Sequence, residues 1–385
     1  MKTEFSNIIC VADVNVTELM EKALGELALP EVFVQQAKQM FLTDKRGLFG
    51  LRSRTKLEES RAVVYRFNVP LKFGQGVMRH IVNATDLRMG GRGCIYSHPT
   101  TLYRGTSLKY DEERLESICG TDKAQIMEDY ALICCTVTRG LGDTLSQAVL
   151  ELGVCVPIVF FGSGVGLRDR LGLLRITVPV EKEVLWFLVP RSDAELVEKT
   201  LIPRARLDVP GHGFIYKRYV HAPVVNLRVR HGKRVHAASM EQVIAALDEV
   251  RGSSDWRRLG SRKIESLLKG ANNTNAMKGL FFIGEEEEAD LFRRTAMDNG
   301  ARGATLNVLE MRSYRAHEQG QSAEEAMESL SREFCDIIIP LNLEETIISK
   351  IEKTGLFEAG KSCMLKVIPA ERPVSFSHLR SGSGA

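Results

Sequence analysis

Three glycine-containing turns carry basic or imidazole side chains, a combination that can bind an anion. Their sequences are LRMGGRGCIY (87–96), LDVPGHGFIY (207–216) and TGLFEAGKSCM (354–364). Glycine lets the backbone approach a ligand, successive N–H groups form an anion-binding nest, and a neighbouring Arg or Lys adds charge-assisted hydrogen bonds. The predicted binding residues are Arg88, Gly90, Gly91, Arg92 and Gly93 in the first turn, Gly211, His212 and Gly213 in the second, and Gly360 and Lys361 in the third.

Each turn lies between a predicted helix and a predicted strand, at the same place in a pattern that occurs three times. The pattern is strand, helix, strand, long variable loop, strand, helix, strand. The variable loops are residues 43–60, 165–182 and 315–333, and the expected helices are residues 15–29, 72–88, 141–153, 194–207, 285–300 and 343–355. The sequence therefore predicts units over residues 1–105, 130–228 and 276–370, connectors over 106–129 and 229–275 (with a short helix), and a flexible tail over 371–385.

One such βαββαβ unit is a ferredoxin-like layer, in which two helices cover one face of a four-stranded sheet. Apolar residues occupy both faces of strands such as IICVA, DIIIP and VLWFLVP, so the second sheet face is expected to be buried too. The predicted fold class is α+β, with three ferredoxin-like repeats in one chain that assemble as a pseudo-trimer.

Composition limits the other possibilities. The chain has 385 residues, of which 44% are hydrophobic, and a formal charge of +3, which gives no general attraction to nucleic acid. No apolar run approaches the roughly 20 residues that span a bilayer, and the N-terminus becomes polar too soon for a signal peptide. We therefore expect a cytoplasmic protein without membrane insertion. The eight cysteines form no CxxC pair, and we expect buried thiols.

The turns, together with the long loops, resemble features of the PII signal-transduction superfamily. GGRGCIY (90–96) and PGHGFIY (210–216) look like its phosphate-binding B-loop. ARGATLNVLEMRSYRAHEQG (301–320) looks like its second strand entering the mobile T-loop, and FGSGVGLRDRLGLL (161–174) with EKEVLWFLVP (181–190) is similar to the divergent PII-like branch. The resemblance implies a nucleotide between the B-loop of one unit and the T-loop base of the next. Those bases would be Gly47 in the first unit, Gly162, Ser163 and Gly164 in the second, and Gly303, Ala304 and Thr305 in the third.

The resemblance thus predicts a regulatory sensor without catalytic activity. Its ligand would be a small anion, with ATP, ADP, AMP or another nucleotide as the regulatory ligand, bound in clefts between the repeats. Ligand binding would order one long loop, which would engage a protein partner such as a transporter or an enzyme. The single chain would act as a monomeric pseudo-trimer. On this interpretation, Gly213→Val or Arg92→Glu abolishes ligand binding without unfolding the chain.

Other interpretations remain open. The glycines can equally mark ordinary helix-to-strand turns that need a positive φ. An enzyme could use His98 and His212 in the clefts, although no nucleophile elbow, HExxH or P-loop is present. Cys94 and His98 lie roughly 13 Å apart on a predicted strand, too far for a shared metal. The basic segments 45–56 and 228–236 lack the paired aromatic residues that bind RNA bases. A purely structural PII-like scaffold is the last alternative.

Overall fold

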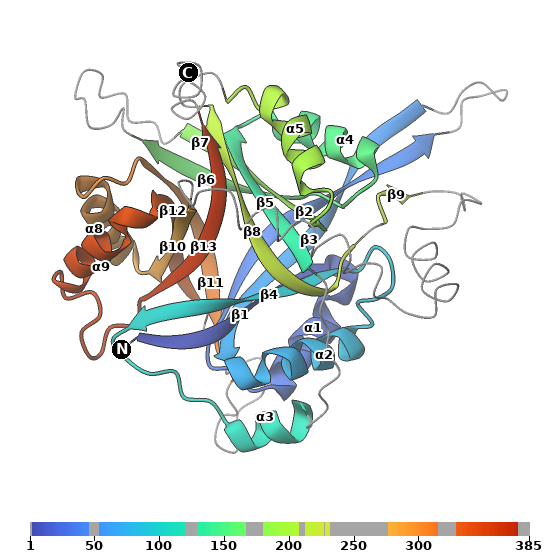
Figure 1. The fold of residues 1–385 in the computed structure, drawn as a ribbon. Helices are drawn as coiled ribbons and strands as arrows, with labels where there is room; N and C mark the ends of the chain where they lie inside the picture. The colour runs from blue at the N-terminus through green and yellow to red at the C-terminus, as the bar shows by residue number, and fades with distance from the viewer. Residues whose placement is uncertain are drawn as a thin grey trace.

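Long strands and amphipathic helices alternate along the chain. The structure is a computed structural model that describes residues 2–45, 54–119, 129–166, 180–207, 212–226, 228–231, 276–314 and 329–375. Helices α1, α2, α4, α8 and α9 each bury one apolar stripe against the sheet, as their hydrophobic periodicity requires. Figure 1 shows the helix pairs α1/α2, α4/α5 and α8/α9 at three separate places on the outside of the sheet.

The elements come in the following order. The first stretch of the chain forms β1 (Lys2–Asp13), α1 (Thr17–Glu26), β2 (Val32–Lys45), β3 (Arg54–Pro70), α2 (Gly74–Thr85), β4 (Gly93–Arg104) and α3 (Glu112–Cys119). The second forms β5 (Asp129–Thr138), α4 (Gly142–Leu152), β6 (Ile158–Gly166), β7 (Val180–Pro190), α5 (Ala194–Arg204), β8 (Gly213–Val224) and β9 (Arg230–His231). The third forms β10 (Ala276–Gly284), α8 (Glu286–Asp298), β11 (Gly303–Arg312), β12 (Leu330–Pro340), α9 (Glu344–Glu352) and β13 (Met364–Ser375).

The strands of all three stretches join in one sheet, so the predicted fold class is wrong. In the described residues the strand order is β10-β12-β11-β6-β7-β5-β8-β13-β4-β1-β3-β2-β9, and the further pairings β10–β13, β11–β2, β6–β2 and β8–β4 close it into an antiparallel β-barrel. Among the described strands, only the short β9 pairs in parallel, with β2. Separate ferredoxin-like sheets would leave their outer strands with unpaired N–H and C=O groups, and closure of the sheet satisfies these groups. The unit of this fold is therefore the closed sheet rather than three separate repeats.

Both faces of the sheet are buried, as the apolar residues on both strand faces predict. One apolar cluster fills the interior and includes Ile9, Tyr96, Trp186, Tyr216 and Phe334. Three further clusters lie outside, one beneath α1 and α2, one beneath α4 and α5, and one beneath α8 and α9. Burial on both sides holds each strand in register, because a slip of one residue would exchange the two faces.

Strands from different stretches meet three at a time at two junctions. At the first junction β2, β6 and β11 pair with one another, each over a few residues. At the second, β4, β8 and β13 do the same, with register shifts in β4–β8 and β13–β8. Where three strands meet, they cannot stay paired along their whole length. The hydrogen-bonded pairing of the sheet is therefore most easily interrupted at these junctions.

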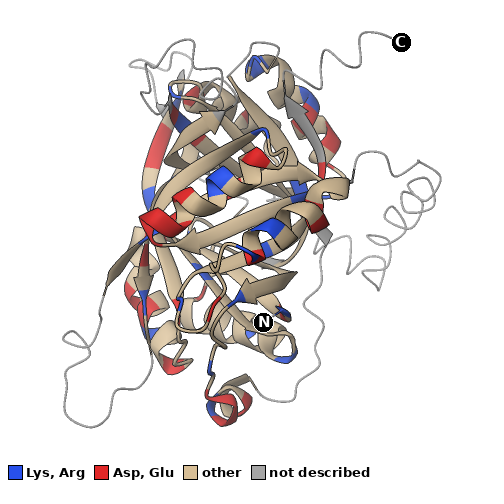
Figure 2. Cartoon of the chain, turned by 90° about the vertical axis from the view of Figure 1, so that its left-hand side faces the viewer, with Lys and Arg blue, Asp and Glu red and all other residues tan. Residues whose placement is uncertain are grey.

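All three predicted variable loops are shorter than expected, since within the second one β6 continues to Gly166 and β7 begins at Val180. Strand β3 begins at Arg54, so residues 54–60 are strand rather than loop, and residues 43–45 still belong to β2. Likewise β12 begins at Leu330. The middle parts of the three loops lie outside the described residues. None of the helices in the described part of the chain has the length and apolar composition needed to cross a bilayer. Acidic and basic positions are interspersed along the helices on the side shown in Figure 2.

Candidate functional site

The recurring glycines of the first two turns have a steric cause within the fold. Gly93 and Gly213 have φ values of +141° and +149°, and a Cβ on either would lie 1.8 Å from a carbonyl oxygen of the neighbouring strand, that of Val11 or Thr136. No side chain fits at that distance. Gly213→Val is therefore expected to unfold the chain, and the prediction that this variant keeps its fold is wrong.

The arginines of the first turn are bonded to the end of the preceding helix. Arg92 Nη1 donates to the carbonyl oxygen of Thr85 at 2.9 Å, and Arg88 Nη1 donates to Asn83 Oδ1 at 3.0 Å. Cations near the last carbonyls of a helix stabilise its C-terminus. These contacts give both arginines a structural role in α2.

Each turn also meets a strand end or helix from another part of the chain. The Gly91 N–H donates to Asn226 Oδ1 at 3.2 Å, and the Gly360 N–H donates to Thr106 Oγ1 at 3.4 Å. The Lys361 ammonium lies 3.8 Å from Glu288 on α8. The remaining predicted residues of the turns lie as follows: Gly90 packs near Arg228, the carbonyl of His212 accepts a hydrogen bond from the Thr138 N–H, and Gly211 lies outside the described residues.

The predicted T-loop bases are brought together by strand pairing. Gly164 lies opposite Thr305, and Ser163 lies opposite Leu306, where β6 pairs with β11; Gly303 and Ala304 pair with the following residues of β6. Gly47 lies outside the described residues. Gly162 and Ser163 line a groove, whereas none of the predicted binding residues of the three glycine turns lines either cavity described below. The two predicted halves of a nucleotide site thus do not meet in one cavity.

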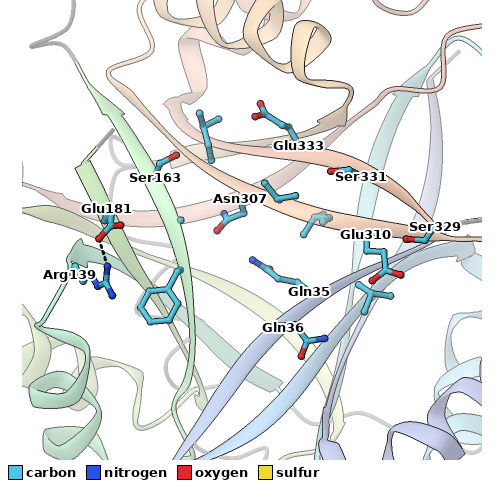
Figure 3. A pocket seen from close by; sticks show the side chains of 16 residues that line it. Gln35, Gln36, Arg139, Ser163, Glu181, Asn307, Glu310, Ser329, Ser331 and Glu333 are labelled. Atoms are coloured by element: carbon cyan, nitrogen blue, oxygen red, sulfur yellow. Dashed lines mark hydrogen bonds and ion pairs between the residues drawn. The ribbon is translucent and has the colours of Figure 1, made fainter. Parts of the chain in front are cut away.

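The groove lies at the junction of β2, β6 and β11 and has a volume of about 830 Å³. Figure 3 shows side chains from the three strands, and from the start of β12, arranged around it. Its polar lining residues are Gln35, Gln36, Arg139, Ser163, Glu181, Asn307, Glu310, Ser329, Ser331 and Glu333. A groove of this volume can hold a small molecule.

The charges of the groove do not favour an anion. Three carboxylates and one guanidinium line it. Arg139 pairs with Glu181, and Arg312 forms two hydrogen bonds with Glu310 that hold the pKa of that carboxyl below its ordinary value. Glu333 is half-buried, and burial raises its pKa. The remaining charge of the groove is thus acidic.

A second cavity, here called the chamber, lies inside the sheet and has a volume of about 30 Å³. Three cationic side chains line it, Arg66 on β3, Arg218 on β8 and Lys366 on β13, and the only carboxylate among its described lining residues is Asp336 on β12. All four are more than nine-tenths buried. Tyr216 donates a hydrogen bond to Asp336 Oδ2 at 2.8 Å. With all four side chains ionised, the described lining of the chamber carries an excess of two positive charges.

Burial and mutual repulsion change the titration of these groups. Burial, with the added repulsion of Arg66 and Arg218, lowers the pKa of Lys366 to about 7. Burial likewise lowers the pKa of Arg66 to about 10, with Arg218 acting in the same direction. Burial raises the pKa of Asp336 to about 6. Each of these three shifts disfavours the ionised form. The pKa of Arg218 is raised instead, because the attraction of neighbouring groups such as Tyr216 and Asp336 outweighs its burial.

Arg66 is held rigidly although it has no carboxylate partner among the described residues. Its Nη2 donates to Gln35 Oε1 at 2.6 Å, and its Cζ lies 5.0 Å from the Trp186 ring and 5.6 Å from the Phe334 ring. Its Nη1 is buried and makes no hydrogen bond. Rings at this distance stabilise a cation without neutralising it, so a donor remains directed at the chamber.

Sequence reasoning did not single out Arg66, Lys366 or Asp336, and it noted Arg218 only as a basic residue that follows the second glycine turn. The signal that could have found them is a charged residue at an inward position of an otherwise apolar strand, as in VVYRFNV (63–69), FIYKRYV (214–220), CMLKVIP (363–369) and CDIIIP (335–340). Thr305 alone is shared with the predicted set. It lines the chamber, is 2% exposed, and its hydroxyl makes no hydrogen bond.

The histidine and cysteine residues considered for catalysis or metal binding line neither cavity. His98 is buried on β4, where burial, with Arg218 and Lys366 nearby, keeps its pKa well below the ordinary value. The eight cysteines are free and buried, as predicted. Within the described ranges no group of three or more His, Cys, Asp or Glu side chains could hold a metal ion.

The chain was also compared with known proteins. No family model and no curated protein matches it. The resemblance to the PII superfamily accordingly stays a prediction.

Proposed function

We propose that this protein binds a small anion, and that the anion occupies the chamber. The observation that carries the proposal is the convergence of three buried cations on one small cavity that holds a single carboxylate among its described lining residues. The proposal agrees with the sequence in expecting a small anionic ligand. It places the ligand in the chamber inside the sheet instead of at the glycine turns.

The buried cations of the chamber have too few carboxylate partners among its described lining residues. A buried ion costs several kcal/mol of desolvation unless partners offset it. When Lys366 is protonated, Asp336 can offset one of the three cations, and two have no counter-charge among the described lining residues. A bound anion would supply that charge and accept hydrogen bonds from Arg66 Nη1, Arg218 Nε and the Thr305 hydroxyl, which are buried and without a hydrogen-bond partner in the described structure.

The volume of the chamber limits the size of the anion. Since a cavity of roughly 10–15 Å³ by this measure admits one water molecule, about 30 Å³ admits an ion of a few atoms. A nucleotide does not fit there, and the larger groove has acidic residues. Nucleotide binding, signalling to a protein partner and a cytoplasmic location stay predictions from the resemblance.

The test measures thermal stability in sodium salts of iodide, nitrate, sulfate and phosphate against a large organic anion at equal ionic strength. An anion that binds only the folded chain raises its stability by about 2.7 kcal/mol at one hundred times Kd. In the organic salt, Lys366→Met should be more stable than the wild type, because it removes an uncompensated buried charge. With the small anion, the wild type should gain Tm and Lys366→Met should not.

A matched control uses a lysine outside the chamber. Lys72 is exposed and pairs with Glu112, so Lys72→Met should respond to anions like the wild type. The proposal is wrong if no small anion raises Tm, or if Lys366→Met responds as strongly as the wild type.

A further inference from the structure

The three strands at the groove leave a gap in the wall of the sheet. Strand β11 pairs with β6 through residues 303–306 and with β2 through residues 310–312, while β2 pairs with β6 through residues 38–39. Between these pairings, the edges of β2, β6 and β11 that face the junction form no ladder with one another. The groove occupies this gap.

Two amide side chains connect the groove with the chamber. Asn307 lines both cavities, is 5% exposed, and has a buried Oδ1 that makes no hydrogen bond. Gln35 lines the groove and accepts the hydrogen bond of Arg66, which lines the chamber. In Figure 3 both side chains reach into the space between the strands. The groove and the chamber are thus separated by side chains, with no paired backbone between them.

Resting on the proposed function, we infer that the gap between β2, β6 and β11 is the route by which the anion reaches the chamber, and that Asn307 and Gln35 are its gate. Both are uncharged, so neither traps nor repels an ion. A side chain rotation at either position opens the barrier without breaking a backbone hydrogen bond, and such rotations are fast.

Gly162 keeps room for this gate. A Cβ at position 162 would lie 2.6 Å from Asn307 Oδ1 and 2.7 Å from the Leu306 carbonyl oxygen. A methyl group there would press on the Asn307 side chain and would also push against the backbone of β11 at Leu306. The neighbouring residue Ser163 lines the groove as well, so the sequence FGSG places the smallest residue directly beside the gate.

The junction of β4, β8 and β13 offers no comparable route in the described residues. The side chains on its inner side, among them His98, Thr100, Val220 and Ile368, are at most 3% exposed.

The experiment follows iodide binding by stopped-flow fluorescence. Iodide quenches indole on contact, and the Trp186 ring lies beside Arg66. The chain has two tryptophans, so a Trp256→Phe background leaves Trp186 as the reporter. In this background Asn307→Leu and, separately, Gly162→Ala should slow association and dissociation together by about tenfold, with Kd changed less than twofold, as expected for a barrier on the route.

Val308→Ala is the matched control, because Val308 lies next to Asn307 on β11 but is 66% exposed at the outer groove. Its rate constants should equal those of the background chain. Unchanged rates in both gate variants, or a change in dissociation alone, would overturn the route while leaving the proposed function intact. Absence of iodide quenching in the background chain itself contradicts the proposed function, and the route with it.

Discussion

Lys217 and Arg218 are neighbours on β8 and both are buried, yet they meet different surroundings on the two faces of the sheet. Lys217 faces α5, where its ammonium lies 2.9 Å from the Glu198 carboxylate. Arg218 faces the interior, where it contacts the Phe281 ring and forms no ion pair with a described carboxylate. Under the helices a buried cation has its own counter-charge, whereas three cations in the chamber share Asp336. The outer pair is compensated within the protein, and the proposed function assigns the inner cations to a bound anion.

Removal of the Lys217–Glu198 ion pair should give the largest change in the free energy of unfolding. Glu198→Gln leaves Lys217 buried without a counter-charge, and the free energy of unfolding should fall by about 3 kcal/mol. Urea unfolding measures the change. Glu195→Gln on the same helix is the control, because the Lys199–Glu195 pair is exposed, and it should cost about 0.3 kcal/mol. Equal effects of the two changes would show that burial does not distinguish them.

The chamber should make stability depend on pH. Because the pKa of Lys366 is lowered to about 7 in the folded chain, the unfolded chain binds more protons than the folded one between pH 7 and its ordinary pKa of about 10.4. Stability should therefore rise with pH in this window, by at most about 1.4 kcal/mol per pH unit from this group.

The comparison with Lys366→Met isolates that contribution. Arg66, Arg218, His98 and Glu31 also act on this site, and they remain in both proteins. Urea unfolding at pH 7.5 and 9.5 without a small anion should show a steeper rise for the wild type than for the variant. Parallel pH profiles would argue that Lys366 finds its counter-charge within the protein.

The groove should give the smallest effect. Arg139 and Glu181 are both exposed, so water screens their attraction. Arg139→Met should leave Tm and the affinity for small anions unchanged, as measured by thermal shift in the salts used for the chamber. A loss of anion binding in this variant would move the site from the chamber to the groove.

Local structure was largely predictable from the sequence. The helix expected over residues 285–300 is α8, Glu286–Asp298, with a capping box between Glu285 and Glu288, and the one expected over 343–355 contains α9. Asp193 precedes α5 but makes no capping hydrogen bond with its side chain. The prediction of a loop over residues 43–60 was wrong for residues 54–60, which form strand. Their pairing with β2 outweighs the low strand propensity of the charged residues among them.

The candidate site was not predictable in the same way. Glycine turns are easily recognised in a sequence because their residues are close together along the chain. In the structure, Gly93 and Gly213 are required because a neighbouring strand leaves no room for a side chain. Arg66, Arg218 and Lys366 are separated by about 150 residues each along the chain, and nothing in their local sequence shows that they face one cavity.

The sequence by itself determined the helices, the strands and the burial of both sheet faces, since these follow from residue periodicity over short distances. The tertiary structure decided that the strands close into one sheet, because pairing between distant edges depends on all of them at once. It also decided which charges are left without partners. That balance is a property of the space the strands enclose, so it exists only once the sheet has closed.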